Sequence, residues 1–264
     1  ALASIAAEMA GQPWEAFVVD NASVDGSGGI AAEFAPQTHL IANAENIGFA
    51  RGINQGLRRA SAPLVLIINP DCRLAEGAMA AMRSALDADP ECAIVGPRIL
   101  DPDGAVQGSA RGDPDMFTGL FGRTTWLRRL FPGLPVSKRN VVIDVPDGSG
   151  AVIVDWVSGA CMLARRDALE KVKGFDERYF LYWEDADLCR RLRQAGYHVR
   201  YLPAATAIHL VGHSSKRAQA AAIRAFHDSA YLYYATHVAP RGLKRMLARL
   251  ILQARCYLRL RSAA

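Results

Sequence analysis

The sequence predicts an α/β protein in which a mostly parallel central sheet is flanked by helices. Short apolar runs alternate with segments of helical periodicity through the first half of the chain, which is typical of strand–helix–strand units. Several of these apolar runs end in polar residues, among them Asp20, Asn21 and Asp71. Ligands of such sheets bind at the carboxyl ends of strands, so these residues indicate where the site should lie.

Strand and helix signals alternate over the first hundred residues. Strands are expected at residues 16–19, 38–41, 64–68 and 93–95. A polar turn at 23–27 precedes a short helix, and longer helices are expected at 49–60 and 76–87. The run Leu64–Ile68 predicts the most buried strand, because all five residues are apolar.

The second half begins with an irregular region. Residues 101–154 are rich in glycine and proline, with an apolar and basic patch at 126–131, and we expect them to cross over the site. Regular elements then resume, with strands expected at 160–164, 198–201 and 206–208 and helices at 166–172 and from about 184. We expect residues 1–215 to form the α/β domain and 216–264 to form basic amphipathic helices.

Charge is distributed unevenly along the 264 residues. The net charge is +5 and the pI is about 9.1, but no acidic residue follows Asp228. Seven cations follow it: Arg241, Lys244, Arg245, Arg249, Arg255, Arg259 and Arg261. The rest of the chain is slightly acidic, so we expect no nucleic-acid partner. The tail fits either a helix on an anionic membrane surface or a helix packed on the domain with a solvated basic face.

The cysteines and the hydropathy of the chain indicate the cellular compartment in which the protein works. Five scattered cysteines without a CxxC pair argue against a disulfide framework or a zinc cluster and favour a reducing cytosol. No run approaches the roughly 18 apolar residues of a membrane span, and the start of the sequence lacks the pattern of a signal peptide. We expect a cytoplasmic protein, peripheral at the inner face of the cell membrane.

A cluster of carboxylates is the main catalytic candidate. Glu184, Asp185 and Asp187 directly follow the aromatic run Tyr179–Trp183. An apolar environment raises the pKa of a carboxyl group, which suits a general base. The alternative is structural, because acidic residues in a first helical turn stabilise the helix dipole.

Other polar residues suggest a nucleotide and metal site, although none is specific alone. The chain has no GxGxxG after its first strand and no GxxxxGK[ST], which disfavours dinucleotide and P-loop enzymes. Asp71 follows a buried strand and could hold Mg²⁺ or Mn²⁺, and His209 could share a Mn²⁺ ion with it. The alternatives are ordinary turn residues and structural histidines, including His213.

Six short blocks occur in a fixed order, and together they are more specific than any one of them. They are VVDNASVDGS at 18–27, NIGFARGIN at 46–54, NPD at 69–71, DWVSGACM at 155–162, GFDE at 174–177 and YWEDADLC at 182–189. Over about residues 1–240 the chain resembles family 2 glycosyltransferases with a GT-A fold. It is most similar to the rhamnosyltransferase-like branch that builds bacterial surface polysaccharides.

The resemblance implies a role for each matching position. Asp185 corresponds to the catalytic base, with Glu184 as its supporting neighbour. Asp71, in the place of the family's DxD motif, would hold Mg²⁺ or Mn²⁺ with His209. The nucleotide-sugar, dTDP- or UDP-linked, would contact Asp20, Asn21, Ser23, Asn46, Gly48, Phe49, Asn54, Asn69 and Asp71. The acceptor, a glycan or lipid-linked sugar, would contact Trp156, Ser158, Gly159 and Trp183.

The resemblance also implies a strand before the first helix, and the sequence begins inside that helix at Ala1–Ser4. We therefore expect an N-terminally clipped sequence with two unpaired strand edges. The predicted function is inverting transfer of a sugar, L-rhamnose from dTDP-rhamnose, in cell-surface polysaccharide synthesis. A sugar nucleotidyltransferase and a non-catalytic nucleotide-sugar-binding remnant are the alternatives.

Overall fold

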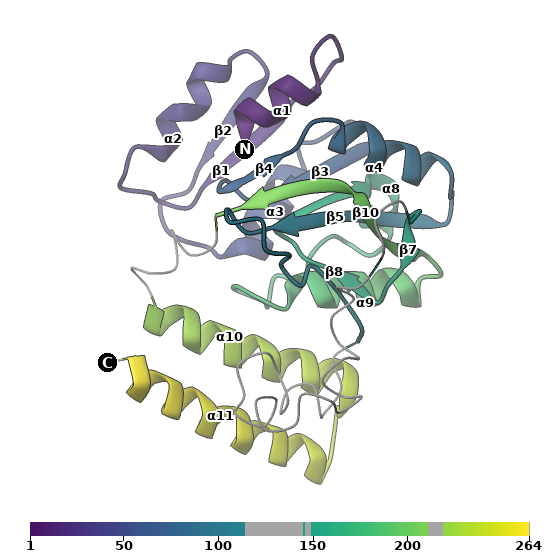
Figure 1. Cartoon of the computed structure of the whole chain (residues 1–264). Coiled ribbons are helices and arrows are strands. Elements are labelled where there is room, and N and C mark those ends of the chain that lie inside the picture. The colour runs from purple at the N-terminus through teal and green to yellow at the C-terminus, as the bar shows by residue number, and fades with distance from the viewer. Residues whose placement is uncertain (114–144, 146–148, 211–218, 264) are drawn as a thin grey trace.

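A six-stranded sheet forms the centre of the molecule (Figure 1). The computed structural model describes residues 1–113, 145, 149–210 and 219–263; the predicted patch at 126–131 and His213 fall outside them. The strand order is β3–β9–β5–β10–β4, and β7 pairs with β10. These strands are β3 (Leu64–Ile68), β9 (Cys161–Arg165), β5 (Cys92–Leu100), β10 (His198–His209), β4 (Cys72–Leu74) and β7 (Val152–Ile153).

Helices cover both faces of this sheet, as predicted, because its strands are apolar on both sides. On β9, Met162 and Ala164 pack into one core cluster, and Cys161 and Leu163 pack into the other. One face is covered by α4 (Ala78–Asp87), and the other by α8 (Arg166–Lys171) and α9 (Glu184–Gln194). Four consecutive β9 side chains are fully buried, which a strand covered on both faces requires.

The expectation of a mostly parallel sheet is corrected to a mixed one. β5 and β10 pair in parallel, whereas β9 is antiparallel to both β3 and β5, and β4 and β7 are antiparallel to β10. The direction of β9 accounts for most of the difference, because β9 enters the sheet between β3 and β5 after a long excursion and runs opposite to both.

A second, two-stranded sheet lies beside the first. β1 (Ala16–Asp20) pairs in parallel with β2 (Thr38–Ala42), and α3 (Phe49–Leu57) packs against β1. Among the described strands, β1 pairs only with β2 and β3 only with β9. Near the start of the chain, α1 (Leu2–Glu8) packs on β4, where the Leu74 N–H donates to Ser4 Oγ. The short helices α2 (Ser27–Ile30) and η1 (Ala31–Phe34) connect β1 to β2.

Two strands predicted separately are one. Residues 198–201 and 206–208 belong to β10, whose pairing with β5 shifts register between Leu202 and Thr206. Pro203 lies in this irregularity, where its missing N–H breaks no ladder bond. Downstream of β5, β6 (Ala110–Arg111) pairs with β8 (Trp156–Val157), which brings part of the irregular region beside the sheet.

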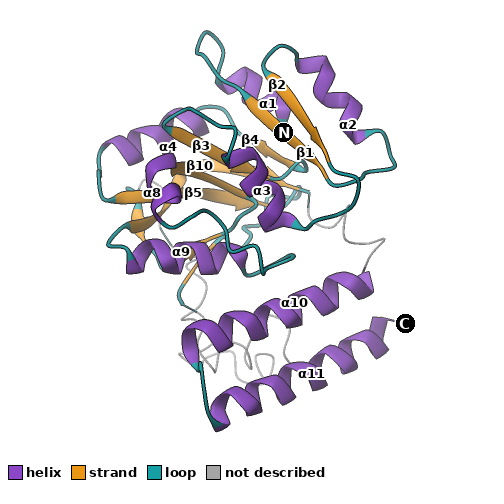
Figure 2. Cartoon of the chain, turned by 180° about the vertical axis from the view of Figure 1, so that it is seen from behind, coloured by secondary structure: helices purple, strands orange, loops and turns teal. Residues whose placement is uncertain are grey.

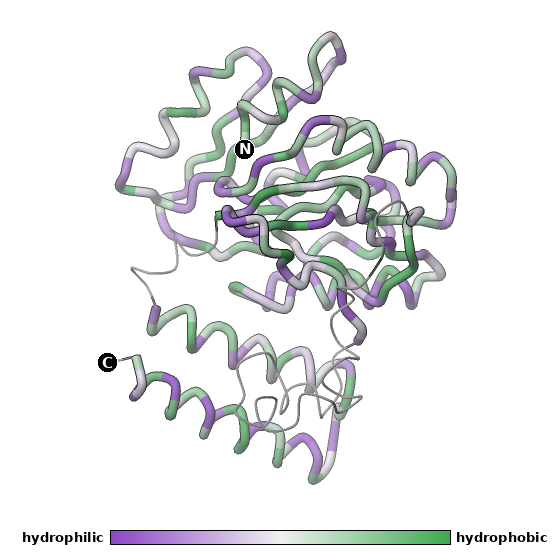
Figure 3. The backbone as a smooth tube through the Cα atoms, viewed as in Figure 1, coloured by the Kyte–Doolittle hydropathy of each residue, from purple (hydrophilic) through white to green (hydrophobic). Residues whose placement is uncertain are grey.

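The C-terminal residues form two antiparallel helices, as the views in Figures 1 and 2 agree. They are α10 (Gln219–Tyr233), which a π-helical turn η3 (Tyr234–Val238) extends, and α11 (Leu243–Ala263). α10 packs on the sheet domain through its buried residues, whereas α11 has none. Along α11, apolar and polar residues alternate (Figure 3). The predicted boundary at 215/216 falls outside the described residues. Among the described helices, none combines the length and apolar character needed to cross a membrane.

Candidate active site

The first turn of α9 presents Asp185 to Gly159, in the turn between β8 and β9. The Gly159 N–H donates to Asp185 Oδ2 over 2.9 Å, and the Ala186 N–H donates to Oδ1 over 2.8 Å. A Cβ atom on Gly159 would lie 3.4 Å from Asp185 Cβ, in ordinary van der Waals contact, so the two backbones lie close together there. Asp185 is half-buried and thus retains access to solvent. A carboxylate held by backbone donors and open on one side is suited to accept a proton.

Glu184 and Asp185 are adjacent, but their carboxyl groups are buried to different extents and differ in their pKa values. Glu184 is 5% exposed and its Oε2 has no hydrogen-bond partner. Burial, followed by the charge of Asp185, raises the pKa of Glu184 to about 8. Burial also raises the pKa of Asp185, against the opposing effect of the N–H groups of Gly159 and Ala186 and of the charge on Arg111. Glu184 is therefore largely protonated at neutral pH, whereas the two N–H donors of Asp185 favour its charged form.

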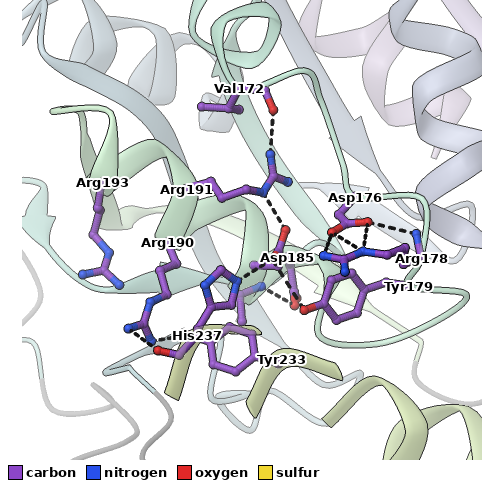
Figure 4. A network of polar contacts seen from close by, with 12 residues as sticks. Val172, Asp176, Arg178, Tyr179, Asp185, Arg190, Arg191, Arg193, Tyr233 and His237 are labelled. Atoms are coloured by element: carbon purple, nitrogen blue, oxygen red, sulfur yellow. Dashed lines mark hydrogen bonds and ion pairs between the residues drawn. The ribbon is translucent and has the colours of Figure 1, made fainter. Parts of the chain in front are cut away.

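Asp187, two residues further along α9, lies in a different environment. It is 1% exposed, and its carboxylate accepts from Arg191 Nε over 2.7 Å and contacts His237 Nε2 at 2.6 Å. The Tyr179 hydroxyl also donates to it, over 3.5 Å. Figure 4 shows Arg191, Tyr179 and His237 converging from three different segments. Asp187 therefore connects α9 to the C-terminal helices and has no open side for a substrate.

A second group of predicted residues lies at the opposite end of the site. In the β4–β10 ladder, His209 is opposite Cys72, which brings the imidazole beside the preceding residue Asp71. His209 Nε2 lies 3.2 Å from Asp71 Oδ1 and 3.4 Å from Asn69 Nδ2. The hydrogen bond with Asp71 raises the pKa of His209. An imidazole nitrogen and a carboxylate oxygen at this spacing could both contact one cation.

Gln107 completes this second group, and the sequence analysis missed it. Its Oε1 lies 3.2 Å from His209 Nδ1, and its Nε2 donates to Asp101 Oδ1 and to the His209 carbonyl over 2.7 and 3.1 Å. Gln107 lies in the region expected to be irregular, where no periodicity or motif distinguishes it. Gln107 reaches His209 because residues 101–111 fold back along the end of β5, beside β10.

The predicted acceptor residues lie along the β6–β8 pair. Trp156 Nε1 donates to the Gly112 carbonyl over 3.1 Å, and the guanidinium of Arg111 lies 5.0 Å from the Trp156 ring. Ser158 Oγ accepts from the Ala160 N–H over 3.3 Å. The Ala160 carbonyl in turn accepts from the backbone N–H of Asn69, and this bond connects the segment to the group of Asn69, Asp71 and His209. Arg111, like Gln107, carried no signal in the sequence.

Trp183 lies apart from these residues, against the C-terminal helices. It precedes α9 with a left-handed φ of 68°. Its ring centroid lies 5.9 Å from Phe226 and 5.3 Å from Tyr233, both in α10. The indole Nε1 is buried without a hydrogen-bond partner. The contact between Trp183 and the acceptor therefore stays a prediction.

Several of the predicted nucleotide residues, Asp20, Asn21, Ser23 and Gly48, gather at the end of β1. Asp20 Oδ1 accepts from the Ser23 N–H over 2.9 Å, and Asn21 Nδ2 donates to the Gly48 carbonyl over 3.2 Å. Asn43 also donates to Asn21 Oδ1 and pairs with Gln55, and neither residue was predicted. These contacts fix the turn that follows β1 and hold it against the start of α3.

Gly48 and Phe49 connect this turn to the region of Asp185. Gly48 has a φ of +89°, and a Cβ there would lie 2.6 Å from the Phe180 carbonyl oxygen, so both backbone and space require glycine. Its N–H is taken by Asn46 Oδ1. The Phe49 ring lies 3.7 Å from a Cβ position built on Gly159, beside the residue that orients Asp185.

Asn54 is buried and its amide contacts only protein atoms. Nδ2 donates to the Phe175 carbonyl and to Glu177 over 2.9 and 3.1 Å, and Oδ1 accepts from the Phe175 N–H over 2.9 Å. This connects α3 to the 174–177 block. The structure thus brings Asn69, Asp71 and His209 together, and Asp185 with Glu184 and Gly159. No contact joins Asp20 to either group within the described residues.

Comparisons with known proteins agree with this geometry. The family model described as glycosyl transferase family 2 matches residues 1–173, and one described as the N-terminal domain of galactosyltransferase matches 154–214. The N-acetylglucosaminyl-diphospho-decaprenol L-rhamnosyltransferase of Mycobacterium tuberculosis is 33% identical over 237 residues, 85% of this chain and 75% of that protein. Rhamnosyltransferase WbbL of Escherichia coli is 42% identical over 83 residues, 31% of each chain.

Among solved structures, the mannosyltransferase PcManGT from Pyrobaculum calidifontis, in complex with GDP-Man and Mn²⁺, matches with a TM-score of 0.57. It is 20% identical, and the match covers 99% of this chain and 66% of that one. The likeness confirms the GT-A fold that the sequence predicts. With a family model over most of its length and a relative at 33% identity, the chain belongs to glycosyltransferase family 2.

Proposed function

We propose that this glycosyltransferase moves L-rhamnose from dTDP-rhamnose onto a lipid-linked glycan acceptor, with inversion at the anomeric carbon, in bacterial cell-surface polysaccharide synthesis. The observation that carries the proposal is the half-buried Asp185 carboxylate, held by the Gly159 and Ala186 N–H groups. The names of the Mycobacterium tuberculosis and Escherichia coli relatives support rhamnose as the sugar, and the first supports a lipid-diphosphate acceptor.

Asp185 would act as the general base. As the acceptor hydroxyl oxygen forms its bond to the anomeric carbon, its proton passes to Asp185 and the bond to the nucleoside diphosphate breaks. Gly159 and Ala186 keep the carboxylate oriented, which lowers the entropic cost of reaching the reactive geometry. Glu184, neutral at pH 7 because of its raised pKa, adds no second charge to compete for the proton.

Asp71 and His209 would hold a divalent cation, Mn²⁺ or Mg²⁺. Their donor set fits, because a carboxylate oxygen and an imidazole nitrogen 3.2 Å apart face each other and both remain partly exposed. Within the described ranges, no group of three or more acidic, histidine or cysteine residues surrounds this point, so diphosphate oxygens and water would complete the coordination. When bound, the cation neutralises charge on the leaving diphosphate.

The donor nucleotide would lie against the turn that follows β1. Asp20 and Asn21 are half-buried there, with Ser23, Asn46, Gly48 and Phe49 nearby, and Asn69 lies beside Asp71. We assign Asn54 to this set through its support of α3. The acceptor would lie along Trp156, Ser158 and Gly159, with Trp183 at the α10 side.

A panel of nucleotide sugars, incubated with a lipid-linked GlcNAc acceptor and Mn²⁺, tests the proposal. We expect transfer with dTDP-rhamnose, with an inverted linkage seen by NMR, and its loss in Asp71→Ala. With inorganic pyrophosphate added, formation of a nucleoside triphosphate and a sugar 1-phosphate from the nucleotide sugar would instead identify a nucleotidyltransferase. Binding of every donor without turnover would favour the non-catalytic alternative.

We further propose that α11 binds an anionic membrane surface on the cytoplasmic side, where a lipid-linked acceptor would lie. Its large apolar side chains are exposed: Leu243 at 65%, Met246 at 54%, Leu250 at 56% and Leu258 at 64%. They alternate with the seven cations of the tail, and an apolar stripe flanked by cations is complementary to anionic lipid.

Flotation with phosphatidylglycerol vesicles tests this surface in the full chain. The double variant Leu250→Glu and Leu258→Glu should lose most of the vesicle-bound fraction. Ile153→Glu, a matched change at an exposed apolar residue outside the tail, should bind as the wild type does. Equal binding by all three proteins contradicts the proposal.

A further inference from the structure

The amide of Gln107 has a fixed orientation. Its Nε2 lies between two acceptors, Asp101 Oδ1 at 2.7 Å and the His209 carbonyl oxygen at 3.1 Å. A reversed amide would place an oxygen against both acceptors, so the Nε2 position must be the NH₂ group. The oxygen Oε1 is then the atom that faces His209 Nδ1, at 3.2 Å.

This orientation places hydrogen on Nδ1 of His209. An amide oxygen can only accept, so Nδ1 donates to Gln107. In the protonated ring Nε2 also carries hydrogen and donates to Asp71 Oδ1, 3.2 Å away. When the ring loses one proton and Gln107 retains the hydrogen on Nδ1, Nε2 has a lone pair that can bind a cation, and Asn69 Nδ2 lies 3.4 Å from it.

We propose that Gln107 is a positioning residue that presents Nε2 of His209, together with Asp71, to a divalent cation. The inference rests on the proposed metal site and adds to it a residue from outside every motif of the sequence. A partner on the far nitrogen of a metal-binding histidine fixes ring orientation and tautomer, and its loss typically weakens metal binding about 10- to 100-fold.

The location of Gln107 also matters. Gln107 and Arg111 belong to one short segment; the first contacts His209, and the second lies over Trp156 and reduces the pKa of Asp185 against the larger effect of burial. The segment therefore spans the distance between the proposed metal residues and the proposed base. A shift of this segment would disturb both ends of the site together.

Two measurements test the inference. In ¹⁵N spectra of the imidazole groups at a pH where His209 is neutral, with the signal assigned by its loss in His209→Asn, we expect hydrogen on Nδ1. In Gln107→Leu, Mn²⁺ affinity measured by the EPR signal of the free ion, with a nucleoside diphosphate present, should fall at least about 10-fold. Gln194→Leu, an exposed glutamine of α9, is the matched control and should bind Mn²⁺ as the wild type does.

Hydrogen on Nε2 in the wild type overturns the role of Gln107, as does a folded Gln107→Leu variant with Mn²⁺ affinity within twofold of the wild type. The tautomer measurement needs no substitution at Gln107, so it decides even where the leucine variant fails to fold. Failure of the wild type to bind Mn²⁺ would instead overturn the metal site of the proposed function, and the inference with it.

Discussion

The two sides of helix α9 give identical side chains opposite roles. On one side, Asp185 accepts only backbone N–H groups and is half open to solvent. On the other, Asp187 is 1% exposed and is surrounded by the side chains of Arg191, His237 and Tyr179. A carboxylate with three side-chain partners has little freedom to exchange a proton with a ligand. The comparison indicates that a carboxylate on α9 can accept a proton from a ligand only where it is exposed to solvent and is held by backbone N–H groups instead of by charged side chains.

Glu184 shows a third outcome within the same turn of helix. It is buried like Asp187, but within the part of the chain that the structure describes its Oε2 has no hydrogen-bond partner. Its raised pKa follows from that environment. In the first turn of α9, Asp185 is therefore expected to be a base, Glu184 a neutral neighbour and Asp187 a structural residue. Each expectation can be tested separately.

The largest effect is expected for Asp185→Asn. Loss of the general base should lower kcat between about 10²- and 10⁴-fold. The fold should be retained, because asparagine keeps one acceptor for the Gly159 or the Ala186 N–H, although losing the second bond lowers the melting temperature slightly. Asp167→Asn is a matched control, since Asp167 accepts from the following N–H over 2.7 Å in the first turn of α8. Near-normal turnover by Asp185→Asn would contradict the assignment of the base.

Asp187→Asn should instead reduce stability. The change leaves the Arg191 guanidinium without its buried counter-charge, which typically costs about 3 kcal/mol or more. Urea unfolding followed by circular dichroism measures the loss, and kcat at a temperature where the variant is folded should stay close to wild type. A loss below about 1 kcal/mol, or a drop in kcat like that of Asp185→Asn, would erase the proposed contrast between the two sides of α9.

The smallest effect on activity is expected for Glu184→Gln, and its effect on stability depends on pH. The pKa of Glu184 is raised from 4.5 to about 8, so between these values the folded state holds a proton that the unfolded state has lost. Stability of the wild type should therefore fall as pH rises through this window, by up to about 1.4 kcal/mol per pH unit.

Glutamine resembles the protonated carboxyl group, so the variant should lose this pH dependence and keep its activity at neutral pH. Thermal melts of both proteins from pH 5 to pH 8 measure the difference. If the melting temperatures of the two proteins change with pH in the same way over that range, Glu184 is ionised in the folded enzyme. A large loss of kcat in the variant would show that Glu184 takes part in the chemistry.

Local sequence patterns predict elements whose contacts are local or periodic. The bounds of the strand at 64–68 were confirmed residue for residue, because five consecutive apolar residues suit a strand. The prediction that it is the most buried strand was wrong: only Ile67 is buried, whereas β9 and β5 are buried over most of their length. The helix at Glu184 was predicted from its acidic start and its stop at Gly196. The mixed pairing of the sheet was not predicted, since the direction of β9 depends on the path of a long connection without periodicity.

The candidate site divides in the same way. Residues within the six ordered blocks, such as Asp71 and Asp185, are recognisable because their order along the chain is itself informative. Gln107 and His237 lie in no block, and each matters only through a contact more than 40 residues away in sequence. No local pattern specifies such a contact.

The sequence by itself determined the α/β class, the family and the carboxylate cluster, because hydrophobic periodicity and ordered motifs are properties of neighbouring residues. Tertiary structure alone decided which carboxylate is open and which is buried, and which residue orients His209. The physical reason is that burial, counter-charges and backbone donors come from segments distant in the chain. These shift a pKa or fix a tautomer only after the sheet has brought them together.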